Sequence, residues 1–311
     1  MVGKEEASEA AAPTLRGLMR RALRPPVEVV ALPTLAPLRQ GRAGHPERDP
    51  ALPPLVDLAG RPKVLLLVGP GGAGKTMAAN WLCSQLDAAG LLLGQALVAA
   101  TDPGVVGLAQ YLPPRALHQP ATRTAKDAED LTRSILLEAE GDDPPLVTLL
   151  DAGGGSNALA AVLERDRGLF ARLETRGVAV VMLWHWTPRA HDLALLQAFE
   201  ALGVRPTATA MVLNGAHARE GWDAYDGLRG QPIYQAALWA GAAEVWMPAL
   251  RQDVALEVER KGLLFGHARH GRVPEWRQGV APVDGDAATE LGLWMEDVAP
   301  EWAPIGSWVR P

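Results

Sequence analysis

Residues 69–76 read Gly-Pro-Gly-Gly-Ala-Gly-Lys-Thr, and this stretch decides the fold. It directly follows an apolar run at residues 64–68 and directly precedes residues 76–89, which have the composition of a helix. A buried strand, a glycine-rich loop and a helix N-terminus together aim backbone N–H groups and the positive end of a helix dipole at one point. The stretch therefore predicts a phosphate-binding loop. A glycine-rich turn without a ligand is the simpler alternative.

Each residue type in this loop has a separate task in holding a nucleotide. The glycines let the backbone turn tightly and approach an anion closely. Lys75 has the reach to contact the β- and γ-phosphates, and the Thr76 hydroxyl is a ligand for Mg²⁺. The loop residues predicted to bind the nucleotide are Gly69, Gly71, Gly72, Ala73, Gly74, Lys75, Thr76 and Met77.

Composition limits the class of protein. The 311 residues are 48% hydrophobic, which suffices for one large α/β core or two smaller ones and argues against a disordered chain. A net charge of −6 argues against a protein that coats nucleic acid over its whole surface. The single cysteine, Cys83, has no disulfide partner within the chain and is expected to be a core thiol. No apolar stretch is long enough to span a bilayer, and the start resembles no secretion signal, so we expect a cytoplasmic protein.

Three regions differ in pattern along the chain. Residues 1–61 are rich in Ala, Pro and Arg and are interpreted as an N-terminal arm; residues 14–48 carry seven arginines against two glutamates. The arm is expected to be solvated or loosely docked, with contact to a membrane, DNA or a protein partner as alternatives. Residues 62–273 are predicted to form the nucleotide-binding domain. Residues 274–311 are interpreted as a tail with one short helix near residues 287–297.

The central region alternates between apolar strands and segments of helical spacing. Such alternation is typical of a parallel sheet covered by helices on both faces, so we predict an α/β, three-layer P-loop NTPase fold with a mostly parallel sheet. The strands are expected near residues 63–68, 94–100, 145–150, 178–184, 207–213 and 243–247.

Two aspartates follow predicted strands. In an open parallel sheet, ligands bind beyond the carboxyl ends of the strands. Asp102 follows the second strand, where it could orient the water that attacks the γ-phosphate or could begin a turn with Pro103. Asp151 ends the third strand before a glycine-rich loop, where it could hold Mg²⁺ or cap the next helix. We predict catalytic roles for Lys75, Asp102 and Asp151, and metal binding by Thr76 and Asp151.

Two further polar residues lie at strand ends. Asn214 follows the fifth predicted strand; its amide could read a purine base, or it could sit in an Asn-Gly turn. His185 lies between two tryptophans at the end of the fourth, and without a second metal ligand at suitable spacing it is expected to be structural.

Together these residues give the chain a resemblance to the ParA/MinD-type P-loop ATPases, and within that group it most resembles the TraL-like proteins of conjugal-transfer systems. The resemblance covers about residues 62–266. The motifs that carry it are residues 69–76, 101–103, 151–157, 212–214, 247–248 and 254–257.

The resemblance implies a role for each matching residue. Lys75 and Thr76 would hold phosphate and Mg²⁺, Asp102 would serve the hydrolytic water, Asp151 would sense the γ-phosphate and Asn214 would contact adenine. The family usually carries a second lysine immediately before the paired glycines, which reaches across a nucleotide-sandwich dimer. Pro70 occupies that position here and supplies no charge.

The leading hypothesis is therefore an ATPase switch that uses ATP and Mg²⁺, forms an ATP-dependent homodimer and serves plasmid partition or conjugal transfer with a protein partner. A small-molecule kinase or ATP-dependent ligase is a second possibility; Arg115 and Arg123 are weak candidates for its lid arginines. A non-hydrolysing nucleotide-binding adaptor is a third, and Pro70 makes it credible.

Overall fold

The computed structural model describes residues 48–102, 107–154, 157–218 and 221–310. Residues 1–47, which make up most of the predicted arm, lie outside the described residues, as do Pro103, Gly155 and Ser156 of the motifs above. The proposed division of the chain at residues 61 and 273 stays a prediction.

Six parallel strands form one sheet in the order β2-β3-β1-β4-β5-β6 across the described residues. All six predicted strands are confirmed, although the second begins at residue 96, after a turn. The strands are β1 (Lys63–Val68), β2 (Ala96–Ala100), β3 (Val147–Asp151), β4 (Ala179–Trp186), β5 (Ala208–Asn214) and β6 (Ala243–Met247). The helices are α2 (Lys75–Ala88), α3 (Ala125–Ala139), α4 (Asn157–Arg165), α5 (Leu169–Thr175), α6 (Ala194–Ala201), α7 (Asp226–Arg229), α8 (Pro232–Trp239), α9 (Gln252–Lys261), α10 (Phe265–Ala268), α11 (Gly285–Trp302) and α12 (Gly306–Val309).

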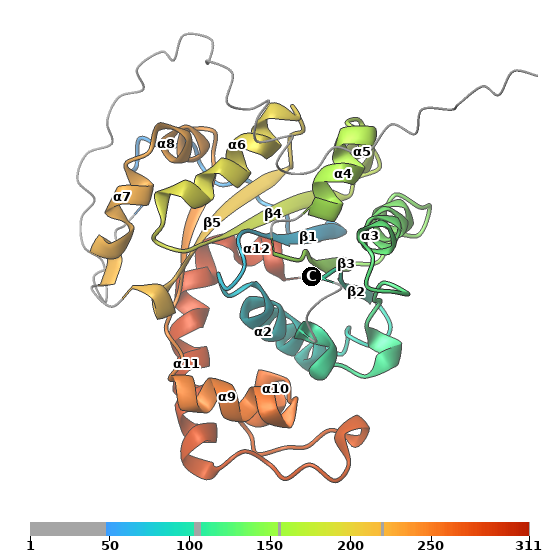
Figure 1. Ribbon diagram of the computed structural model, residues 1–311, viewed down its shortest axis with the longest axis vertical. Helices are drawn as coiled ribbons and strands as arrows, with labels where there is room; N and C mark the ends of the chain where they lie inside the picture. Colours follow the sequence, from blue (N-terminus) through green and yellow to red (C-terminus); the bar gives the residue numbers. More distant parts are fainter. Residues whose placement is uncertain (1–47, 103–106, 155–156, 219–220, 311) are drawn as a thin grey trace, which may run out of the picture.

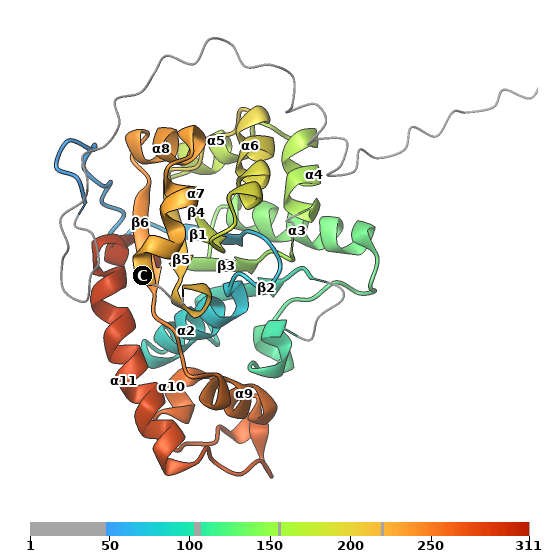
Figure 2. The same ribbon diagram turned by 60° about the vertical axis from the view of Figure 1, so that its left-hand side comes forward.

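The sheet separates two hydrophobic cores, because alternate residues of a strand point to opposite faces. In β1, Leu65 and Leu67 belong to the core under α2, α9, α10 and α11, whereas Val64 and Leu66 belong to the core under α3 to α8. Figures 1 and 2 show these two helical layers on either side of the sheet. The chain thus has the three-layer α/β architecture with a parallel sheet that the sequence predicted.

The C-terminal region packs against the sheet and its covering helices. The sequence suggested a short helix near residues 287–297, but α11 runs from Gly285 to Trp302 and packs along β6. The ring of Trp302 lies 4.9 Å from that of Trp81 in α2, centroid to centroid. Burial of these apolar faces extends the helix beyond the range that its local pattern indicated.

A buried lysine ties the two ends of the described chain together. Lys63, at the start of β1, has no exposed surface. Its Nζ donates to the carbonyl oxygens of Leu58 (3.2 Å), Ser307 (2.9 Å) and Arg310 (2.6 Å). The ammonium group therefore compensates carbonyl dipoles around α12, and burial lowers its pKa.

We expect Lys63→Met to lower the free energy of unfolding by about 3 kcal/mol, because three carbonyl groups, in one buried and two part-buried contacts, lose a charged donor. Urea denaturation monitored by circular dichroism measures this loss. Lys126→Met, at an exposed position of α3, is the matched control and should change stability by less than about 0.5 kcal/mol. Equal stability of the two variants would contradict the role assigned to Lys63.

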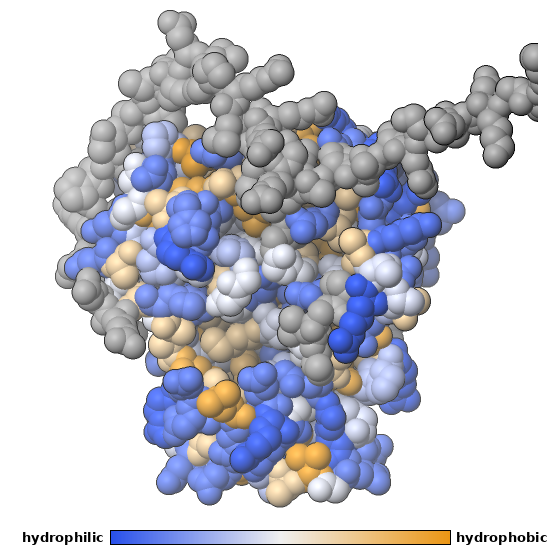
Figure 3. Space-filling model, viewed as in Figure 1, coloured by the Kyte–Doolittle hydropathy of each residue, from blue (hydrophilic) through white to orange (hydrophobic). Residues whose placement is uncertain are grey.

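Hydrophobic side chains are scattered singly over the surface of the C-terminal helices. Over α9 to α11, Figure 3 shows mainly hydrophilic residues with hydrophobic ones isolated among them. Leu256 and Leu293, each more than half exposed, are examples from α9 and α11. Within the described ranges, no helix combines the length and apolar character needed to cross a bilayer.

Candidate functional site

The glycine-rich loop joins the central strand β1 to α2, as the sequence predicted. Three of its glycines have positive φ: Gly69 (137°), Gly72 (76°) and Gly74 (93°). A Cβ at position 69 would lie 2.2 Å from the carbonyl oxygen of His185, and one at position 74 would lie 2.5 Å from Nδ2 of Asn214. Glycine is therefore required at these two positions both by conformation and by space.

Lys75 lies at the first turn of α2 and bends back over the loop. Its Nζ donates to the carbonyl oxygens of Gly69 (3.0 Å) and Pro70 (2.8 Å). The side chain is buried, and burial lowers its pKa, while the charges of Asp151 and Asp102 act in the opposite direction. A cation in this position, next to backbone N–H groups of a helix N-terminus, is suited to hold a polyanion.

Thr76 and Asp151 meet across the site. The Thr76 hydroxyl donates to Oδ2 of Asp151 at 2.9 Å, although 75 residues separate them in the sequence. Burial raises the pKa of Asp151 to about 6, and the hydrogen bond from Thr76 and the charge of Lys75 partly oppose that shift. A hydroxyl and a carboxylate oxygen are hard donors of the kind that Mg²⁺ prefers.

Asp102 approaches the same site from the end of β2. Its Oδ2 accepts a hydrogen bond from the backbone N–H of Gly154 at 3.4 Å. A Cβ at Gly153 would lie 3.1 Å from the Cα of Asp102, and one at Gly154 would lie 3.3 Å from the Cα of Gly71. The small residues after Asp151 thus allow the ends of β2 and β3 to pack against the loop.

These groups surround a cavity of about 320 Å³. Its volume is at the lower end of the range for small-molecule sites. The predicted residues that line it are Gly71, Gly72, Gly74, Lys75, Thr76, Met77, Asp102 and Asp151. Gly107 and Leu108 also line it, and no motif in the sequence indicated them. Nucleotide contact stays a prediction for all of these residues.

Three predicted binding residues, Gly69, Ala73 and Asn214, do not line the cavity. Asn214 is buried behind the loop: its Nδ2 donates to the carbonyl oxygen of Ala73 at 3.1 Å, and its Oδ1 accepts from the backbone N–H of Ala216 at 3.0 Å. The predicted Asn-Gly turn thus describes part of the role of Asn214, and its side-chain amide also holds the glycine-rich loop in place. Contact with a base stays a prediction.

Two histidines support the loop in ways that the sequence did not show. His217 donates from Nε2 to the carbonyl oxygen of Gly72 at 2.8 Å, since a carbonyl only accepts. His185 lies within β4, with its backbone against Gly69. The residue is 1% exposed, and its Nε2 has no hydrogen-bond partner within the described part of the chain. His185 could be noticed in the sequence because it lies near the end of the fourth predicted strand, whereas His217 lies three residues beyond the end of β5.

The buried His185 is expected to make the free energy of unfolding depend more steeply on pH below pH 6.5. Burial, with a smaller effect from the charge of Lys75, lowers its pKa to about 3, whereas an unfolded histidine has a pKa near 6.5. Below pH 6.5 the unfolded chain takes up a proton that the folded chain does not bind until about pH 3, so stability falls as pH falls through this window.

We expect the parent protein to lose about 2 kcal/mol more unfolding free energy between pH 7 and pH 4.5 than the His185→Gln variant does. Urea denaturation at the two pH values measures the difference. His270→Gln, at an exposed position, should retain the slope of the parent. An identical slope in His185→Gln and the parent would show that the ring is not buried in its neutral form.

Among the solved structures that match this chain, several are distant FtsY proteins. No family model matches the chain, and no curated protein matches it. Chloroplast FtsY from Physcomitrella patens is 17% identical with a TM-score of 0.38, over 74% of this chain and 65% of that one. The signal recognition particle receptor FtsY from Elizabethkingia anophelis is 13% identical with a TM-score of 0.39, over 76% and 66%. The cell division protein FtsY from Thermotoga maritima is 13% identical with a TM-score of 0.37, over 89% and 76%.

This chain spans just under two thirds of the length of the first two FtsY proteins. At such identities and scores, the matches assign no activity, partner or nucleotide to it.

Proposed function

We propose that this protein is a Mg²⁺-dependent, ATP-binding molecular switch of the ParA/MinD type. The observation that supports this most directly is the 2.9 Å contact between the Thr76 hydroxyl and the Asp151 carboxylate, with Lys75 buried beside it. It joins a helix N-terminus to the end of the neighbouring strand at the place where a metal–phosphate complex is held in P-loop proteins.

Each residue has a task in this proposal. The loop N–H groups and Lys75 bind the β- and γ-phosphates. Thr76 and Asp151 hold Mg²⁺, which when bound neutralises charge on those phosphates. The described residues contain no cluster of three His, Cys, Asp or Glu side chains that could hold a metal by itself, so the ion would share its coordination with phosphate oxygens and water.

The switching element is the contact between Asp102 and Gly154. Asp102 would orient a water molecule toward the γ-phosphate. The same carboxylate accepts a hydrogen bond from the loop that follows Asp151. Loss of the γ-phosphate would therefore alter the segments that follow both β2 and β3. In this way hydrolysis of the nucleotide would change the surface that a partner contacts.

Adenine as the base, conjugal transfer or plasmid partition as the process, and a cytoplasmic location rest on the family resemblance. So do an ATP-dependent homodimer and a protein partner from the transfer or partition machinery. Contact of the basic arm with nucleic acid or membrane rests on its charge, and the arm lies mostly outside the described residues.

A non-hydrolysing adaptor is the second candidate, and Pro70 favours it. At the position of the family's second lysine, this chain has only a backbone carbonyl, which accepts a hydrogen bond from Lys75. A dimer of this protein would thus need another cation to stabilise the transferred phosphoryl group. Without one, ATP would act by binding alone.

Three measurements on one preparation test the proposal. Affinities for ATP and GTP, measured with and without Mg²⁺, show which nucleotide the protein prefers. Phosphate release without an added acceptor distinguishes the switch from a kinase and from a non-hydrolysing adaptor. The molar mass with ATP, with ADP and without nucleotide shows whether an ATP-dependent dimer forms. We expect ATP binding that Mg²⁺ strengthens, slow turnover and an ATP-dependent dimer that Lys75→Ala abolishes. A monomer in all three states would refute the dimer, and preference for GTP would refute the base assignment.

The metal ligands can be tested in the same assay. We expect Asp151→Asn to remove most of the Mg²⁺ dependence of nucleotide affinity, because a neutral amide is a much weaker ligand for the ion. The matched control is Asp223→Asn, which makes the same change at an exposed aspartate far from Asp151 in the sequence. Unchanged Mg²⁺ dependence in Asp151→Asn would exclude Asp151 as a ligand.

A further inference from the structure

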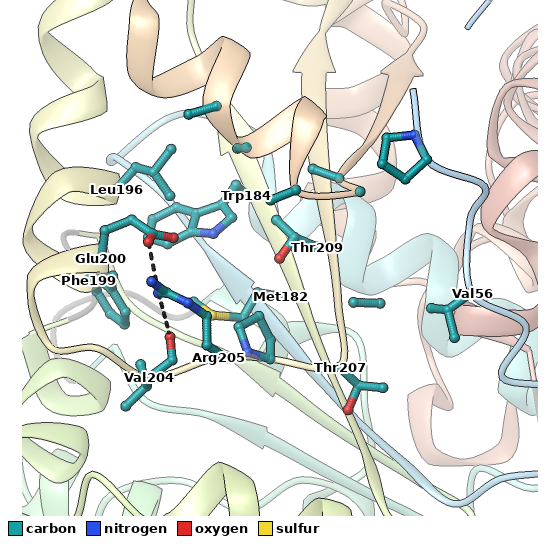
Figure 4. Close-up of a pocket in the computed structure, with 18 of the residues that line it drawn as sticks. Val56, Met182, Trp184, Leu196, Phe199, Glu200, Val204, Arg205, Thr207 and Thr209 are labelled. Carbon is teal, nitrogen blue, oxygen red and sulfur yellow. Dashed lines mark hydrogen bonds and ion pairs between the residues drawn. The ribbon is translucent and has the colours of Figure 1, made fainter. Parts of the chain in front are cut away.

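A second cavity, of about 520 Å³, lies on the sheet face opposite α2 (Figure 4). Met182 and Trp184 of β4 and Thr209 of β5 form its floor, and Leu196 and Phe199 of α6 form one wall. We call it the α6–α8 hollow, because α8 provides the opposite wall. Its lining is mainly apolar, and it shares no lining residue with the nucleotide cavity.

The charges at the hollow are already paired. Among its lining residues, the charged side chains are Glu200 and Arg205, and Nη1 of Arg205 donates to Oε2 of Glu200 at 2.8 Å and to the carbonyl oxygen of Val204 at 3.1 Å. Figure 4 shows both contacts. A charged ligand would have to break this pair, so the hollow is suited to an uncharged, apolar occupant.

The first described residue lies at the edge of the hollow. Arg48 donates from Nη1 to the carbonyl oxygen of Ala242 at 2.7 Å and from Nη2 to that of Pro53 at 2.8 Å. Ala242 and Pro53 both line the hollow. These two bonds hold the chain at its rim, so the 47 residues that precede Arg48 start from this point.

One stretch of those 47 residues has the chemistry that the hollow requires. Residues 27–38 read Val-Glu-Val-Val-Ala-Leu-Pro-Thr-Leu-Ala-Pro-Leu, with a single charged side chain. Residues 39–47, between this stretch and Arg48, are mostly polar and include two glycines. Nine residues extend up to about 30 Å, which is enough to return to a site that adjoins Arg48.

We propose that residues 27–38 of the same chain dock in the α6–α8 hollow. A tether of this length holds its own segment at an effective concentration in the millimolar range, which favours it over a second copy or a separate partner. The segment near residue 20 is a poorer occupant, because Arg16, Arg20, Arg21 and Arg24 would meet an apolar lining. This docking does not depend on nucleotide binding.

Disulfide trapping in the full chain tests the placement. Ala237, on α8, lines the hollow, and the native Cys83 is buried and should not interfere. We expect Leu32→Cys combined with Ala237→Cys to form an intramolecular disulfide at least 10-fold faster than the matched control, Leu18→Cys combined with Ala237→Cys. Equal rates would overturn the proposal. Disulfide-linked dimers as the main product would also overturn it and would assign the hollow to a second copy.

Chemical protection provides an independent readout. In the Ala237→Cys variant, we expect the alkylation rate of the introduced thiol to rise at least 10-fold when Val29 and Leu32 are both replaced by aspartate, because charged side chains disfavour docking in the hollow. The control replaces Leu15 and Leu18 by aspartate and should leave the rate unchanged. An equally slow reaction in both variants, with melting temperatures unchanged, would show that something other than residues 27–38 covers the site.

Discussion

Lys75→Ala is expected to weaken nucleotide binding at least 100-fold, which corresponds to about 3 kcal/mol. In the folded protein, Nζ of Lys75 already lies within hydrogen-bond distance of two loop carbonyl groups, at 3.0 and 2.8 Å, so little rearrangement is needed to bring it to a bound phosphate. A charged donor in a buried site contributes more than one in water, because less solvent screens it.

Titration calorimetry with ATP and Mg²⁺ measures this loss. Lys126→Ala is the matched control, since it removes the same group from an exposed position of α3 and should leave affinity within twofold. Circular dichroism should show that both variants are folded. If Lys75→Ala bound ATP as the parent does, the assignment of residues 69–76 as the phosphate site would be wrong, and the proposed function would fail with it.

Gly69→Ala is expected to lower the free energy of unfolding by at least about 3 kcal/mol, because backbone strain and overpacking each contribute about 1–3 kcal/mol. The residue has φ of 137°, which non-glycine residues rarely adopt, and the new Cβ would lie 2.2 Å from the carbonyl oxygen of His185. That oxygen belongs to the backbone of β4, where His185 pairs with Val212 of β5, so it cannot move without disturbing this pairing.

Gly71→Ala is the matched control in the same loop. Among the described residues, no atom beyond the chain neighbours of Gly71 lies within 4 Å of the added Cβ, so the stability of this variant should change by less than about 1 kcal/mol. Thermal and urea unfolding without nucleotide compare the two variants independently of ligand binding. Similar stabilities would show that the close approach of β4 to the loop is not as the structure describes it.

Local sequence patterns were sufficient to predict the strands of the sheet and the loop that follows β1. The six strands, the glycine-rich loop between β1 and α2 and the positions of the aspartates that follow β2 and end β3 could all be predicted from the sequence. Each depends on residues close together in the chain: an apolar run, a glycine spacing, or a polar residue directly after a strand. The resemblance to ParA/MinD-type ATPases uses the same local motifs, and for that reason it remains a proposal about function.

Only the tertiary structure shows which distant residues support the loop and the sheet. Asn214 holds Ala73 across 141 residues of sequence, and His185 sets the space available to Gly69. The short helix predicted in the tail is the longer α11, because Trp302 packs against Trp81. These contacts join residues far apart in the chain, and periodicity carries no information about which distant surfaces meet. The sequence alone therefore determined the strands and the position of the glycine-rich loop. Packing determined which side chains support that loop and where the α6–α8 hollow lies.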